Sequence, residues 1–175
     1  GTVPAVLAAL FLDKEISAFF VSPVRVAFML VCTGLVLFAG QAAFVRASGK
    51  KRPAGPVSSF LIGVSQAFAL IPGISRSGTT ISTGLVSGIE PEEAFRFSFL
   101  LSVPAIIGAL GYKALTIDVK SALSGNVAGY VVGMIMAFWT GLLGLRFLLA
   151  VIRVKKLYVF GIYCILAGLA GILFL

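Results

Sequence analysis

A short stretch within a long apolar segment gathers the residues that could do chemistry. It reads Pro72-Gly73-Ile74-Ser75-Arg76-Ser77-Gly78-Thr79-Thr80. Arg76 offers a planar, permanently charged fork of N–H donors that matches the oxygens of a phosphate, and the Ser and Thr hydroxyls add further donors. Gly73 and Gly78 let the backbone turn tightly and come close to a ligand. These residue types together indicate an oxyanion site, for which phosphate or pyrophosphate is the natural ligand.

The surroundings of this stretch decide how the donors would be used. We expect a helix to begin near Ser77, so that its free N–H groups and positive dipole end point at the same anion. The alternative is that Arg76 is structural and pairs with carbonyls freed by a broken helix, since Ser and Thr also patch such breaks. An ionisable group within a membrane segment is functional by default, which favours the ligand. Gln66, just upstream, could either line a cavity or cap backbone groups.

The composition indicates that the protein is surrounded by lipid. Hydrophobic residues make up 59% of the 175 residues and charged residues 11%, with a mean hydropathy of +1.11, whereas soluble domains carry about 25% charged residues. The net charge of +8 fits the enrichment of Lys and Arg in cytoplasmic membrane loops, and no basic, aromatic-interleaved polar surface points to a nucleic-acid partner. The absence of histidine excludes His-based metal ligation and His general-base catalysis within these residues.

Apolar runs predict an all-α fold, a polytopic transmembrane helix bundle. The expected helices cover residues 3–12, 24–45, 94–115, 130–150 and 157–175. The first run is already under way at Val3, and no Met precedes Met29. We therefore interpret residues 1–175 as a single integral membrane domain that is truncated at its N-terminus.

The segment 57–88 carries the polar loop at its middle and is predicted to be a re-entrant helix-loop-helix hairpin. Its arms, residues 57–71 and 77–88, would reach roughly 18 to 22 Å, which is short of the ~30 Å hydrocarbon core. A hairpin that enters and leaves on one side puts the basic loops 46–56 and 153–156 in the same compartment. The positive-inside rule makes that compartment the cytoplasm.

Two packing features are also expected. Glu92 and Arg96 are spaced i,i+4 near the end of a span, which favours a local ion pair. Gly125, Gly129 and Gly133 recur at every fourth residue and would form one smooth helix face for close contact with a neighbouring helix.

At its polar loop the chain resembles the undecaprenyl pyrophosphate phosphatase family, the bacitracin-resistance membrane phosphatases. The string PGISRSGTTIS follows GVSQAFALI, and Phe97-Ser98-Phe99-Leu100-Leu101-Ser102-Val103-Pro104-Ala105 comes one short turn later. The resemblance extends through the remaining spans to Leu175. It implies two inverted repeats, each with a re-entrant hairpin and with the site between them, of which this chain would supply the second half.

The resemblance implies hydrolysis of undecaprenyl, or another polyprenyl, diphosphate to the monophosphate, which recycles the cell-wall lipid carrier at the inner membrane. Catalysis would involve Arg76, which grips the diphosphate, with Ser75, Ser77 and Thr80 around it. Substrate binding would involve Gly73, Gly78, Thr79 and Gln66. A divalent cation, magnesium or calcium, is implied, with its ligands outside this segment. The implied partners are the lipid bilayer and the polyprenyl diphosphate, and a homodimer is left open.

The chain departs from the family pattern in one respect. The family's first signature, a Glu-rich loop with Ser and His, is absent, and with it the candidate acid, base and metal-binding carboxylates. These residues therefore describe half a site, and either a serine or an activated water could be the nucleophile. A transporter or flippase of a phosphorylated lipid is the alternative function, because paired re-entrant helices with inverted repeats recur in secondary transporters.

Overall fold

The computed structural model describes residues 1–11, 22–46, 53–116 and 127–174. The regular structure of these residues is entirely helical, which confirms the predicted all-α class. The helices are α1 (Thr2–Phe11), α3 (Pro23–Arg46), α4 (Pro56–Phe68), α5 (Arg76–Val86), α6 (Pro91–Thr116), α8 (Val127–Arg153) and α9 (Tyr158–Phe174).

Three of these helices, α3, α6 and α8, are long and apolar enough to cross a membrane, and α4 and α9 are shorter apolar helices. The chain is therefore an integral membrane protein, as predicted. The buried core joins residues from α3, α5, α6, α8 and α9, with Leu37, Ile81 and Ile152 among its least exposed members. Many large apolar side chains on α3, α6, α8 and α9 are exposed, as expected of helices that contact lipid.

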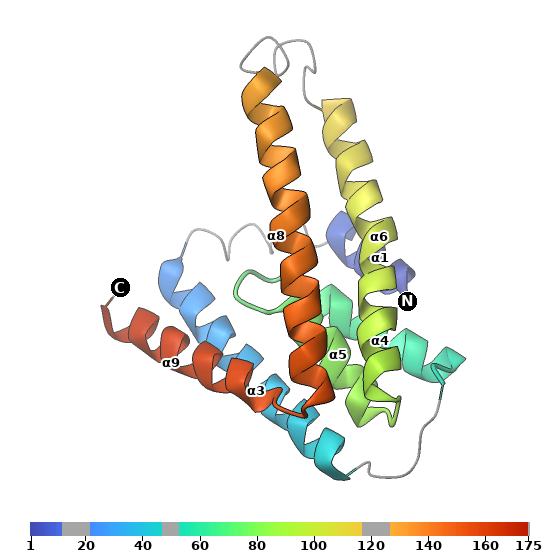
Figure 1. Ribbon diagram of the computed structural model, residues 1–175, viewed down its shortest axis with the longest axis vertical. Coiled ribbons are helices and arrows are strands. Elements are labelled where there is room, and N and C mark those ends of the chain that lie inside the picture. The colour runs from blue at the N-terminus through green and yellow to red at the C-terminus, as the bar shows by residue number, and fades with distance from the viewer. Residues whose placement is uncertain (12–21, 47–52, 117–126, 175) are drawn as a thin grey trace.

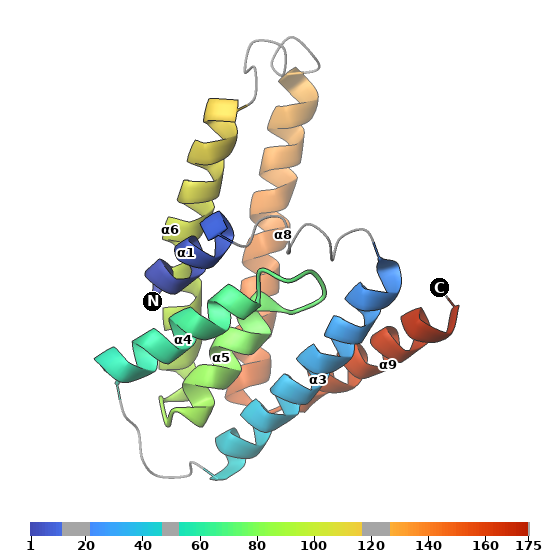
Figure 2. The same cartoon turned by 180° about the vertical axis from the view of Figure 1, so that it is seen from behind.

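Helices α6 and α8 form a long antiparallel pair, and the C-terminal part of α6 and the N-terminal part of α8 extend beyond the rest of the bundle (Figures 1 and 2). An ion pair closes one end of the pair: Arg153 Nε at the end of α8 donates to Glu92 Oε1 at the start of α6, at 2.9 Å. The predicted pair of Arg96 with Glu92 is present at 3.9 Å. The shorter contact, between Arg153 and Glu92, links α8 to α6. The i,i+4 spacing of Glu92 and Arg96 did not predict this link.

Glycines bring α3 and α9 together along their length (Figures 1 and 2). A Cβ atom at Gly34 would lie 2.9 Å from the carbonyl oxygen of Gly161, and one at Gly168 would lie 2.7 Å from that of Ala27. Small residues allow such close approach of membrane helices. The predicted helix contact on α8 is wrong at Gly133, because a Cβ atom added there would meet no atom of the other described residues within 4 Å. Gly125 lies outside the described residues.

The predicted break at Pro72 is confirmed, and α4 and α5 form a helix-loop-helix unit. Helix α4 ends at Phe68, earlier than expected, because the amides of Leu70 and Ile71 bond carbonyls three residues back at 3.2 Å in a tighter turn. Ile71 also precedes a proline, which disfavours helical backbone. Re-entrance into the bilayer and the inverted repeat stay predictions.

The α3–α9 contact generates a stability prediction. Gly34→Ala places a methyl group against the backbone of α9 and the side chain of Ile165, so we expect the free energy of unfolding to fall by about 1–3 kcal/mol. Gly133→Ala is the matched control, since its methyl group meets open space. Thermal stability of the detergent-solubilised variants measures both. Equal melting temperatures for the two variants would contradict the contact.

Candidate functional site

Helix α5 begins at Arg76, one residue before the expected start, and Ser75 caps it. Ser75 is extended (φ −70°, ψ 113°) and its Oγ accepts a hydrogen bond from the amide of Gly78 at 3.2 Å. Among the described residues, the backbone N–H groups of Arg76 and Ser77 have no hydrogen-bond partner. The first turn therefore keeps free donors and the positive end of the helix dipole for an anion.

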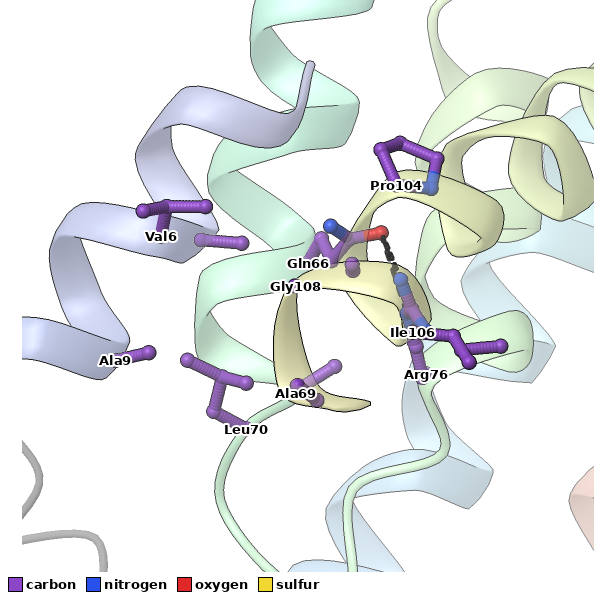
Figure 3. Close-up of a pocket in the computed structure, with 12 residues that line it drawn as sticks. Val6, Ala9, Gln66, Ala69, Leu70, Arg76, Pro104, Ile106 and Gly108 are labelled. Carbon is purple, nitrogen blue, oxygen red and sulfur yellow. Dashed lines mark hydrogen bonds between the residues drawn. The ribbon is translucent and has the colours of Figure 1, made fainter. Parts of the chain in front are cut away.

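The Arg76 side chain is held by neutral acceptors. Gln66 Oε1 on α4 accepts from Arg76 Nε at 3.2 Å and from Nη2 at 2.9 Å, and the Leu101 carbonyl on α6 lies 3.5 Å from Nη2. Figure 3 shows the Gln66 carbonyl turned towards the guanidinium. Arg76 does contact a carbonyl, as the structural alternative predicted, but these contacts leave its Nη1 group unused and its charge without a counter-ion among the described residues. Binding of an anion by Arg76 stays a prediction.

A cavity of about 590 Å³ opens beside this pair, between α1, the end of α4, the start of α5 and the middle of α6 (Figure 3). Its polar lining residues are Gln66 and Arg76, and the rest are apolar and mostly small: Ala5, Val6, Ala9, Ala69, Leu70, Pro104, Ala105, Ile106, Gly108 and Ala109. Gln66 is 2% exposed, and its Nε2 group has no partner. That amide points away from Arg76, towards the α1 side of the cavity.

The hydroxyls of the loop face different surroundings. Thr80, 1% exposed, donates to the Arg76 carbonyl at 2.8 Å and lies 2.6 Å from Ser98 Oγ on α6. Thr79 is buried and its Oγ1 has no partner among the described residues. Arg76 and Gln66 thus line the cavity together, whereas the hydrogen bond between Thr80 and Ser98 joins α5 to α6.

Helix α3 supports the loop through a residue that the sequence reasoning missed. Thr33 Oγ1 donates to the carbonyl of Gly73 at 2.9 Å and accepts from the amide of Ser75 at 3.0 Å. The backbone of Gly73 is left-handed (φ +93°), and a Cβ there would lie 2.9 Å from Met29 Cβ on α3. A hydroxyl within the apolar run 24–45 was the available signal, but nothing in the sequence shows which segment it faces.

The described residues do not fit a resident metal ion. No three His, Cys, Asp or Glu side chains among them lie together. Their carboxylates, Glu90, Glu92 and Glu93, follow the far end of α5, about 15 Å along its axis from Arg76. The polar groups close to Arg76 are therefore hydrogen-bond donors and neutral acceptors and include no carboxylate among the described residues.

Fold and site together define a polytopic membrane protein in which a helix start with free hydrogen-bond donors lies beside a cavity with mostly apolar walls. Residues 1–170 match the family described as bacitracin resistance protein BacA. The chain belongs to this family, which confirms the resemblance at the polar loop.

Relatives from several organisms carry the name undecaprenyl-diphosphatase. The one from Korarchaeum cryptofilum is 39% identical over 97% of this chain and 62% of its own length. The one from Anaeromyxobacter dehalogenans is 42% identical over 97% of this chain and 58% of its own. The chain thus spans about three fifths of these relatives. The relative from Methanothermobacter thermautotrophicus is 41% identical, and 93% of it is covered.

The fit of Gly73 against α3 can be tested with a matched pair. Gly73→Ala adds the strain of a left-handed alanine, about 1–2 kcal/mol, and also a clash with the Val26 carbonyl and Met29. Gly88→Ala adds the same kind of strain at φ +79° with nothing within 4 Å. We expect Gly73→Ala to lower the melting temperature clearly more than Gly88→Ala; an equal loss would mean that α3 does not support the loop.

Proposed function

We propose that the whole protein hydrolyses undecaprenyl diphosphate, or a related polyprenyl diphosphate, to the monophosphate and phosphate, and so recycles the cell-wall lipid carrier. Residues 1–175 supply the phosphate-binding part of the site. One observation carries the proposal: an Arg76 fork held by a neutral amide at a helix start, opening on a cavity with apolar walls. The names of the relatives support it and favour the hydrolase over the transporter alternative.

Each donor has a place in this proposal. Arg76 Nη1 and the amides of Arg76 and Ser77 bind the phosphate oxygens, and Gln66 Nε2 donates one more hydrogen bond from the buried side. Gly73 and Gly78 shape the loop, Ser75 caps α5, and Thr79 and Thr80 lie on the first turn behind it. The first part of the lipid tail lies along the apolar walls of the cavity, which offer no polar group to hold water.

The chemistry follows from this placement. The anhydride bond between the terminal phosphorus and the bridging oxygen breaks, and the bridging oxygen stays with the lipid monophosphate. Negative charge that grows on the phosphate oxygens is stabilised by donors already oriented towards it. The nucleophile is either a serine or water, and the acid and base come from outside the described residues. A divalent cation remains part of the proposal, with ligands equally outside them.

We also propose that the protein lies in the inner membrane with loops 46–56 and 153–156 in the cytoplasm. Contacts between the helix ends support a shared side. Gln41 near the end of α3 donates to the Lys155 carbonyl at 2.9 Å and accepts from the Tyr158 amide at 3.3 Å. Lys155 Nζ lies 5.7 Å from the centre of the Phe44 ring. The end of α3 and the α8–α9 turn therefore lie at the same end of the bundle.

This topology is tested by cysteine labelling in intact cells, after Cys32 and Cys164 are replaced by alanine. Cysteines at positions 50 and 155 should be protected from an impermeant reagent, because both loops are cytoplasmic. A cysteine at position 120 should react, since that loop is expected on the opposite side. Labelling of only one of positions 50 and 155 would refute the shared side.

The activity is tested on the full-length protein by phosphate release from farnesyl diphosphate in detergent. Arg76→Ala should lower kcat/KM by about a hundredfold or more, because it removes a preorganised donor for transition-state charge. Arg96→Ala is the matched control: Arg96 is exposed on α6 in a long ion pair with Glu92, and we expect a change of less than about twofold. Absence of phosphate release by the unmodified protein would reject the hydrolase function.

A further inference from the structure

Thr33 uses its hydroxyl in an unusual way for a threonine in a membrane helix. Thr80 and Thr140 donate to the carbonyl four residues back in their own helix, at 2.8 and 2.7 Å, which is the ordinary pattern. The Thr33 hydroxyl instead donates to Gly73, 40 positions away in sequence. It also accepts from Ser75, so one side chain satisfies two backbone groups of the loop.

The location of Thr33 makes this contact central to the loop. Residues 26, 29, 33 and 37 share one face of α3. Val26 and Met29 pack against Gly73, and a Cβ atom at Gly78 would meet Leu37 Cδ2 at 3.2 Å. Thr33 lies between these apolar contacts and is 1% exposed. Among the described residues, the Gly73 carbonyl and the Ser75 amide have Thr33 as their hydrogen-bond partner, so both peptide groups depend on its buried hydroxyl for a bond within the protein.

We propose that Thr33 is a positioning residue for the anion site. Its hydroxyl fixes the peptide groups of Gly73 and Ser75, which puts Ser75 in place to cap α5 and sets the direction in which Arg76 leaves the helix start. Thr33 reaches the ligand only through these residues. The kinetic consequence rests on the proposed phosphatase function, whereas the effect on the loop backbone does not.

Hydrogen exchange followed by mass spectrometry tests the backbone effect without any activity. Thr33→Val keeps the shape of the side chain and removes the hydroxyl, so the protected amides of Ser75 and Gly78, followed in a peptide covering residues 73–78, should exchange at least about tenfold faster, which is the change expected from loss of about 1.4 kcal/mol of protection. Peptides from α8 should be unchanged. Thr33→Ser keeps the hydroxyl and should restore slow exchange. Thr140→Val, the same substitution at a threonine that bonds its own helix, should leave the loop as it is.

The kinetic readout is phosphate release from farnesyl diphosphate by the full-length protein. Thr33→Val should lower kcat/KM roughly ten- to a hundredfold, the range expected when a reacting group is misplaced by about 1 Å, and Thr33→Ser should recover most of it. If Thr33→Val does not elute as a folded protein, Thr33→Cys replaces it, because a thiol is a weaker donor and acceptor. It should then give an intermediate loss.

The two readouts separate the possible failures. Unchanged exchange at residues 73–78 in Thr33→Val, or a Thr33→Ser variant as impaired as Thr33→Val, overturns the positioning role. Faster exchange with unchanged kcat/KM also overturns it, because the site would not depend on the loop geometry. Absence of phosphate release by the unmodified protein refutes the hydrolase function alone, and the exchange measurements still decide the role of Thr33.

Discussion

The structure of this protein depends on one constraint: where a helix is interrupted inside an apolar protein, each backbone N–H and C=O needs a partner from the protein itself. Several groups of the break between α4 and α5 meet this constraint. A tight turn satisfies the amide of Ile71, Thr33 bonds the Gly73 carbonyl and the Ser75 amide, and the Ser75 hydroxyl bonds the amide of Gly78. The first turn of α5 keeps free donors, and these donors make the candidate site.

Three helices hold the first turn of α5 and its free donors in place. Helix α3 hydrogen-bonds the loop through Thr33 and packs closely against α9 at Gly34 and Gly168. Helix α4 contributes the amide of Gln66, and α6 contributes the Leu101 carbonyl and the hydroxyl of Ser98. The long α8 takes little part, since most of its side chains are exposed to the surroundings.

Sequence reasoning was most successful where structure depends on neighbours along the chain. The apolar runs, the break at Pro72 and the donor-rich turn around Arg76 all follow from local composition, and each was predicted. Contacts between helices were not predicted, because they depend on which helix faces meet. Examples are the hydrogen bonds of Thr33, the Arg153–Glu92 ion pair and the close helix contact at Gly34 instead of Gly133. The sequence indicated that Gln66 is relevant. Its hydrogen bonds to Arg76 could not be predicted, because they depend on how α4 and α5 lie against each other. The assigned roles of the hydroxyls and any cation remain predictions.

The uncharged hydrogen-bond acceptors around Arg76, on Gln66 and Leu101, have an electrostatic consequence. An amide and a carbonyl can orient a guanidinium, but they cannot cancel its charge, so Arg76 keeps a full positive charge in a half-buried position beside apolar walls. In the proposed function the diphosphate would serve as the counter-ion of Arg76, and its binding would offset part of the negative charge of the ligand. Bulk salt would screen such a partly buried attraction less than it screens a pair of exposed charges. In the proposed function the monophosphate carries less charge than the diphosphate and would be held less strongly, so the site would favour the substrate over the product.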